Sequence, residues 1–225
     1  MSDTRAISLV MELRKQGIGD TRVLGAIEQV PRELFVDKPL EYAAYNDTAL
    51  PIACGQTISQ PYVVAFATQA LEIDPNNRVL ELGTGSGYQA AVLSPLCRMV
   101  YTMERHKPLL AVAEARFKEL RLTNIVTRHG DGLRGWPEAA PFDRILLSAA
   151  VPEVPEILIE QLKPGGILVA PVGAPSTAES ISQSLTKIIK KETGIERQKL
   201  LAVIFVPMIE GLPQDARKPE ERRKA

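Results

Sequence analysis

Three glycines at alternate positions follow a short apolar segment near the middle of the chain, in the run Glu81-Leu82-Gly83-Thr84-Gly85-Ser86-Gly87. Arg78 to Leu82 has the character of a strand, and Tyr88 to Leu96 that of a helix. Glycines let the backbone turn tightly and let a ligand approach where a Cβ atom would block it. In an open parallel sheet, ligands bind beyond the carboxyl ends of the strands. The run therefore predicts a ligand-binding turn, with a purely structural turn as the alternative.

Strand and helix patterns alternate from residue 77 onward. We expect strands at 78–82, 99–103, 125–128, 143–148 and 167–171, and helices at 88–96, 108–120 and 153–162. Such alternation implies right-handed crossovers and a mostly parallel sheet. Two later apolar segments, 184–189 and 199–206, flank Glu192-Thr193-Gly194 and predict an antiparallel hairpin. The predicted fold is α/β, with a doubly wound, Rossmann-like, mostly parallel sheet that ends in this hairpin.

The first third of the chain has helical periodicity. The apolar residues expected to face the core are Ile7, Val10, Met11 and Leu13 in a first helix, and Val23, Leu24, Ile27 and Val30 in a second. Pro31 ends the second helix, 32–60 is irregular, and Pro61 is placed to open a helix over 62–72. We expect a single domain over 1–212, made of a helical part (1–75) and the sheet (76–212), and a charged, disordered tail at 213–225.

Composition narrows the possible partners. Lys+Arg and Asp+Glu are both 27, so no net charge draws the chain toward nucleic acid or an anionic membrane. Cys54 and Cys97 form no metal-ligand pattern, and no apolar run approaches the ~20 residues that span a bilayer. The first residues do not resemble a signal peptide. We expect a cytoplasmic monomer that binds no metal, nucleic acid or membrane.

Two more acidic groups follow neighbouring predicted strands. Glu104 closes the second strand, at a separation from the glycine turn where a carboxylate can accept both hydroxyls of a ribose. Its alternative is a solvated charge paired with Arg105 or Lys107. Asp131, between Gly130 and Gly132, could accept from an adenine amino group, or could simply form an Asp-Gly turn. Together the three strand ends predict a nucleoside pocket.

These motifs resemble those of class I S-adenosylmethionine-dependent methyltransferases, and further runs resemble the protein-L-isoaspartate O-methyltransferase family. The runs that carry this closer resemblance are 30–36, 55–62, 128–132, 140–143, 161–166 and 205–207. The resemblance implies S-adenosyl-L-methionine as cofactor, with S-adenosyl-L-homocysteine as product. The implied cofactor-binding residues are Thr57, Ile58, Glu81, Gly83, Thr84, Gly85, Ser86, Gly87, Glu104, Arg105, Asp131 and Gly132.

The resemblance also implies a substrate, the α-carboxylate of L-isoaspartyl residues in damaged proteins and peptides. Its methyl ester would reclose to a succinimide, and hydrolysis would return part of the material to Asp. Ser59 is the implied catalytic residue, whose hydroxyl would hold the reacting carboxylate, with backbone N–H groups of Thr57 to Gln60 nearby. The alternative is that Ser59 only caps a helix beside Pro61. No triad spacing points to Ser59 as a covalent nucleophile.

Some residues carry weaker expectations. We expect His129 and His106 to be structural, Cys54 to be a small buried thiol, and 174–182 to be a mobile loop near the substrate. Ala53-Cys54 and Ser148 depart slightly from the family pattern beside the pocket. Rival functions are methyl transfer to another carboxylate, a small molecule or RNA, a non-catalytic nucleoside-binding module, and a nicotinamide-dependent oxidoreductase. The glycine spacing argues against the last, because the dinucleotide fingerprint has its third glycine one residue later.

Overall fold

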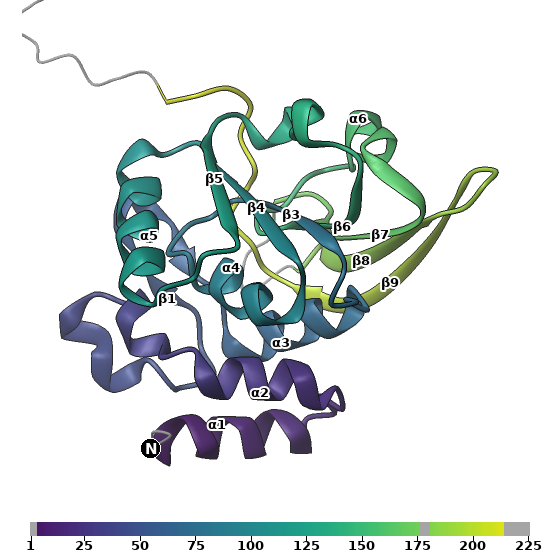
Figure 1. The fold of residues 1–225 in the computed structure, drawn as a ribbon. Helices are drawn as coiled ribbons and strands as arrows, with labels where there is room; N and C mark the ends of the chain where they lie inside the picture. Colours follow the sequence, from purple (N-terminus) through teal and green to yellow (C-terminus); the bar gives the residue numbers. More distant parts are fainter. Residues whose placement is uncertain (1–3, 176–180, 214–225) are drawn as a thin grey trace, which may run out of the picture.

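The computed structural model describes residues 4–175 and 181–213, and it is built around a seven-stranded sheet of order β5-β4-β3-β6-β7-β8-β9 (Figure 1). The strands are β3 (Arg78–Leu82), β4 (Met99–Glu104), β5 (Ile125–His129), β6 (Phe142–Leu147), β7 (Leu162–Val172), β8 (Gln183–Lys190) and β9 (Ile195–Val203). Pairing is parallel from β5 to β7 and antiparallel from β7 to β9. This confirms the predicted mostly parallel sheet with an antiparallel C-terminal hairpin.

The strand order places the glycine turn at a topological switch point. β3 lies between β4 and β6, so the chain leaves β3 toward one edge of the sheet and later returns to add β6 on its other side. The crevice at such a point lies beyond the carboxyl ends of the strands and is where open α/β sheets bind ligands. The turn at 83–87 follows β3 at this end.

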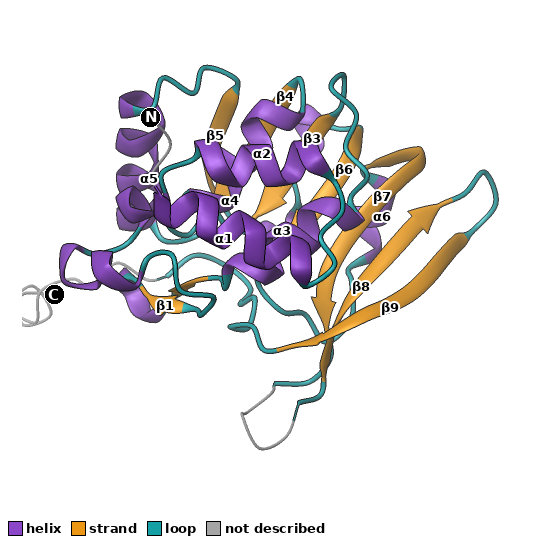
Figure 2. Cartoon of the chain, turned by 90° about the horizontal axis from the view of Figure 1, so that it is seen from below, coloured by secondary structure: helices purple, strands orange, loops and turns teal. Residues whose placement is uncertain are grey.

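Helices cover the sheet unequally. The helices are α1 (Thr4–Lys15), α2 (Thr21–Gln29), α3 (Pro61–Ala70), α4 (Tyr88–Leu93), α5 (Lys107–Glu119) and α6 (Glu156–Glu160). The first four lie across one face (Figure 2), where side chains such as Val64 and Ala91 share a core with Val79 and Val100 of the sheet. On the opposite face, Leu158 of α6 packs with Leu80 and its neighbours. Alternate residues of β3 thus serve two separate cores, as strand geometry requires.

Short elements connect α2 to α3. Four residues, Arg32–Phe35, and then six, Lys38–Ala43, form 3₁₀ helices. A further 3₁₀ turn, Ala53–Gly55, joins the two-residue strands β1 (Leu50–Pro51) and β2 (Thr57–Ile58), which pair antiparallel. This small hairpin delivers the chain to Ser59 and to the start of α3.

Three expectations about the helices and strands are wrong in part. In α1 the expected Leu13 is buried and Val10 is partly buried, but Ile7 and Met11 are exposed and Ala6 and Leu9 are buried instead, because the stripe that packs on the body is rotated from the predicted one. The helix predicted at 153–162 is only Glu156–Glu160, since Pro155 precedes its first turn and β7 begins at Leu162. β9 occupies Ile195–Val203 rather than 199–206.

Two expectations reach beyond the described residues. Apart from residue 213, the tail at 213–225 lies outside them, and so do residues 176–180 of the loop at 174–182. The division of the chain at residue 75 stays a prediction. Among the helices of the described part, none has the length and apolar character needed to cross a membrane.

Candidate active site

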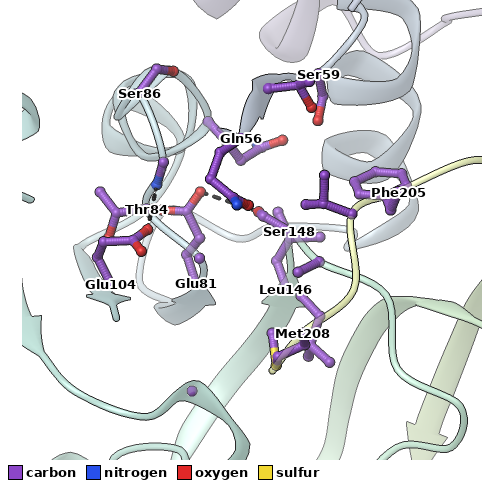
Figure 3. A pocket seen from close by; sticks show the side chains of 18 of the residues that line it. Gln56, Ser59, Glu81, Thr84, Ser86, Glu104, Leu146, Ser148, Phe205 and Met208 are labelled. Carbon is purple, nitrogen blue, oxygen red and sulfur yellow. Dashed lines mark hydrogen bonds between the residues drawn. The ribbon is translucent and has the colours of Figure 1, made fainter. Parts of the chain in front are cut away.

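A pocket opens beyond the carboxyl ends of β3, β4 and β6 (Figure 3). Three loop segments contribute much of its lining: 56–59, the glycine turn at 83–86, and 205–209, which follows β9. Residues at 103–106, at 146–149 and on α3 also line the pocket. Eleven of the thirteen predicted site residues line it, namely Thr57, Ile58, Ser59, Glu81, Gly83, Thr84, Gly85, Ser86, Glu104, Arg105 and Gly132. The two that do not are Gly87 and Asp131.

The glycine turn is held against the end of β4. The amides of Gly83 and Thr84 both donate to the carbonyl oxygen of Met103, at 2.8 and 3.0 Å. Gly87 has a φ of 89°, and a Cβ atom there would lie 2.9 Å from a ring carbon of Phe117. Gly87 is therefore required for close packing of α4 on α5, which explains why it stands behind the pocket wall.

Glu104 combines burial with unused acceptor capacity. It is 5% exposed, and its two carboxylate oxygens accept from the amides of Gly85 and His106, each at 2.8 Å. The alternative pairing with Arg105 or Lys107 is not formed. Each carboxylate oxygen can accept a second hydrogen bond, so both remain able to bind a pair of hydroxyls at the pocket wall. This geometry suits a ribose.

Glu81 is fully buried at the base of the pocket. The hydroxyl of Thr102 donates to one carboxyl oxygen at 2.6 Å, and the hydroxyl of Ser148 lies 3.4 Å from the other. Burial raises the pKa of Glu81 to about 8, although the two hydroxyls act in the opposite direction. Within residues 4–175 and 181–213, no basic side chain forms an ion pair with Glu81, so a cationic ligand group would find an acidic partner here.

Asp131 has a structural role. Its carboxylate accepts from the amides of Leu133 and Gly211, at 3.0 and 2.8 Å. Arg105, at the end of β4, donates to the carbonyl of Gly211 at 3.2 Å. Asp131 and Arg105 therefore anchor the segment after β9 over the strand ends. Contact of Asp131 with an adenine group stays a prediction, while its neighbour Gly132 lines the pocket.

Ser59 lies where the pocket meets an adjoining groove. The groove is bordered by Leu201 to Val206 and shares Ser59 and Ser148 with the pocket. The N-cap residue of α3 is Gln60, so Ser59 is not the cap of that helix. No described residue forms a hydrogen bond with the Ser59 hydroxyl, which leaves it free to bind a ligand.

Sequence reasoning missed part of the lining and misjudged one cysteine. Met208 and Ile209 line the pocket without any sequence signal of their own, whereas Gln56 and Phe205 to Pro207 belong to runs with a family resemblance. His129 is exposed and lies 3.0 Å from the Arg105 carbonyl, and His106 is the N-cap residue of α5. Cys54 is exposed, with a φ of 58° in the β1–β2 turn, so the expected burial of its thiol is wrong. No cluster of metal-ligating side chains occurs among the described residues.

A glycine turn at the switch point of an open sheet, followed by a buried acidic residue at the next strand end, is the arrangement of a nucleoside-binding protein with a Rossmann-like fold. Comparison with known families narrows this further. A family model for protein-L-isoaspartate(D-aspartate) O-methyltransferase (PCMT) matches residues 4–212, and the chain belongs to this family.

Individual relatives agree with this assignment. A protein-L-isoaspartate O-methyltransferase from Paramagnetospirillum magneticum is 58% identical over 95% of this chain and 99% of its own. The solved structure of another protein-L-isoaspartate O-methyltransferase superposes with a TM-score of 0.79 at 30% identity; the match covers 90% of this chain and 65% of that one. A Plasmodium falciparum member crystallised with S-adenosyl-L-homocysteine gives a TM-score of 0.76 at 27% identity, over 91% of this chain and 98% of its own.

Proposed function

We propose that this chain transfers a methyl group from S-adenosyl-L-methionine to the α-carboxylate of L-isoaspartyl residues in damaged proteins and peptides. The observation that carries the proposal is the position of Ser59. Its free hydroxyl stands at the junction between a pocket lined by the acidic residues Glu81 and Glu104 and an adjoining groove. A groove beside a cofactor pocket admits a peptide side chain while the rest of the peptide stays outside.

The pocket residues fit the cofactor. Glu104 retains acceptor capacity on both oxygens and would hold the ribose hydroxyls. Glu81 is a buried acid without a basic partner in the described part of the chain, and it would bind the cationic amino group. Gly83, Gly85 and Gly132 leave their parts of the wall without side chains. When bound, S-adenosyl-L-methionine supplies an activated methyl group on a sulfonium.

The chain's own residues have a modest chemical task, because an isoaspartyl carboxylate is already ionised at neutral pH. They must orient this carboxylate and exclude water that solvates it. The Ser59 hydroxyl donates to one carboxylate oxygen and holds the other toward the cofactor pocket. Val63 and Phe205, which line both the pocket and the groove, shield the junction from solvent. No general base is needed, so the lack of a triad is consistent with this chemistry.

The product accounts for a role in repair. The ester carbonyl is more electrophilic than the carboxylate, so the neighbouring peptide nitrogen attacks it and expels methanol. This closes a succinimide without further help from the enzyme. Hydrolysis of the succinimide returns part of the material to ordinary Asp. Proteins and peptides that carry isoaspartate are therefore the partners. We also propose that the chain works in the cytoplasm, where an exposed thiol such as that of Cys54 stays reduced, and that it acts as a monomer.

The test is transfer of radiolabelled methyl to a synthetic peptide that contains L-isoaspartate, with the matched Asp peptide as control. We expect base-labile label on the isoaspartyl peptide alone. Ser59→Ala should lower kcat by roughly 10- to 100-fold, the loss of a hydrogen bond to a charged group, while the Kd for S-adenosyl-L-homocysteine stays within about twofold. Binding of S-adenosyl-L-homocysteine without transfer to this peptide would refute the substrate and leave methyl transfer to another carboxylate or a small molecule.

A further inference from the structure

Arg32 is a fully buried arginine whose charge faces carbonyls and a ring. It opens the 3₁₀ helix Arg32–Phe35 and is 0% exposed. Its Nε donates to the carbonyl oxygen of Ala44 at 2.8 Å, and its Nη2 donates to the carbonyl oxygen of Ser59 at 2.7 Å. The guanidinium carbon lies 4.6 Å from the centre of the Tyr88 ring. Arg32 therefore contacts three other parts of the chain, at Ala44, Ser59 and Tyr88.

Two of these parts, at Ser59 and Tyr88, line the site. Ser59 stands at the junction of the pocket and the groove, and Tyr88 begins α4 directly after the glycine turn and lines the pocket. The planar guanidinium can donate at its edge to the Ser59 carbonyl and stack with its face on Tyr88. One side chain thus links the loop that presents the Ser59 hydroxyl to the turn that binds the cofactor.

Asp47 holds the other side of the same loop. Its carboxylate accepts from the amide of Tyr62 at 2.8 Å and from the side chain of Gln60 at 3.0 Å. Arg32 therefore fixes the carbonyl of Ser59, and Asp47 fixes the residues that follow it. The hydroxyl between these anchors has no hydrogen-bond partner among the described residues, so its direction depends on how firmly the backbone is held.

Burial of Arg32 is unfavourable in itself. It lowers the pKa of the guanidinium, although Tyr88 and Asp47 act in the opposite direction. One nitrogen, Nη1, is buried without a hydrogen-bond partner in the described structure. An apolar side chain of similar length would fill the same space without these losses. The presence of a guanidinium here is therefore explained by its contacts with the Ser59 carbonyl and the Tyr88 ring rather than by packing.

We infer that Arg32 is a positioning residue, which fixes the Ser59 loop relative to the cofactor turn through its bond to the Ser59 carbonyl and its stack on Tyr88. The inference rests on the proposed function in one respect, that the Ser59 hydroxyl orients the methyl acceptor. Arg32 itself touches neither substrate nor cofactor in this scheme.

The test compares Arg32→Met with Arg144→Met. Arg144 is the control, because it is partly buried and donates to three backbone carbonyls, those of Leu71, Glu72 and Asp143, but it lines neither the pocket nor the groove. Four quantities are measured for each variant well below its melting temperature: kcat and KM with the isoaspartyl peptide, the Kd for S-adenosyl-L-homocysteine, and amide hydrogen exchange over 57–62. Arg32→Lys is measured in parallel, since it keeps the charge and one donor.

We expect Arg32→Met to lower kcat by about 10- to 100-fold, with the Kd changed by less than about threefold and faster exchange over 57–62. Arg32→Lys should recover part of kcat, and Arg144→Met should lose stability alone. Unchanged kcat and exchange in a folded Arg32→Met protein would overturn the inference. If the unmodified protein fails to methylate the isoaspartyl peptide, the proposed function has failed, and exchange over 57–62 alone decides the role of Arg32.

Discussion

Replacing Glu81 by Gln should stabilise the protein in the absence of ligand, by an amount that grows with pH. Burial places the pKa of this carboxyl at about 8 in the folded protein, against 4.5 for the ordinary group. Between these values the folded protein holds a proton that the unfolded chain has released. The contribution of Glu81 to the free energy of unfolding is therefore most favourable below pH 4.5 and falls as the pH rises toward 8.

The size of the effect follows from the width of this window. Each pH unit inside it removes about 1.4 kcal/mol, so roughly 3 kcal/mol has been lost at pH 7. Gln is neutral at every pH. Its amide oxygen can accept from Thr102, and its amide nitrogen can donate to the Ser148 hydroxyl, which would turn from donor to acceptor. Glu81→Gln should therefore raise Tm by about 6–12 °C at pH 7 for a chain of this size, and by little at pH 5.

The assay is thermal unfolding of ligand-free protein from pH 5 to pH 8, with the exposed Glu153→Gln as control. Other groups titrate alike in both proteins, so the difference in Tm isolates Glu81. A difference that does not grow with pH, or a variant that melts below the unmodified protein at pH 8, would contradict the reasoning. The same substitution should weaken S-adenosyl-L-homocysteine binding by about tenfold, because the cationic amino group loses its acidic partner.

Two further substitutions test the packing behind the pocket, at Gly87, and the ribose site, at Glu104. Gly87→Ala should lower the free energy of unfolding by about 2–4 kcal/mol, because it adds left-handed strain and an overlap with Phe117. Gly55→Ala, at a φ of 66° but with open space around it, should lower this free energy by only about 1 kcal/mol. Denaturant titration compares the two variants, and equal losses would show that the overlap is relieved. Glu104→Gln should weaken S-adenosyl-L-homocysteine binding by about tenfold, because charge-assisted hydrogen bonds to the Gly85 amide and to the ribose hydroxyls become neutral ones. Calorimetry measures the Kd, and an unchanged value would show that Glu104 does not bind the ribose.

The sheet could be predicted because its strands are buried and regular. Arg78–Leu82 is strand from end to end as expected, with four of its five residues buried. The edge strand β9 was harder, because its first half carries Glu196, Arg197 and Lys199, which remain exposed and have no apolar alternation. The face of α1 was misassigned because Ile7 and Met11 are apolar in sequence yet exposed in the fold. Hydrophobicity alone does not say which stripe of a surface helix will be covered.

For the site, sequence reasoning worked where a motif sits on one strand end and failed where distant segments meet. Glu104 and the glycine turn could be placed together from their spacing along consecutive strands. Nothing local marks Arg32 as a neighbour of Ser59, because 27 residues separate them and their bond exists only in the folded chain. Asp131 shows the reverse problem, since its strand-end position suggested a ligand contact while its carboxylate binds the amide of Gly211.

The segment at 205–209 also sets an order of events during synthesis. It is held over the strand ends by a parallel bridge between Ala150 and Pro207, with the amide of Met208 donating to the Ala150 carbonyl at 2.7 Å. A ribosome produces the glycine turn, Glu104 and Ser59 long before this wall. A nascent chain that stops at β9 would have the sheet but an incomplete pocket. Tight cofactor binding therefore requires these last contacts to form. Cofactor binding therefore reports that nearly the whole fold has been completed.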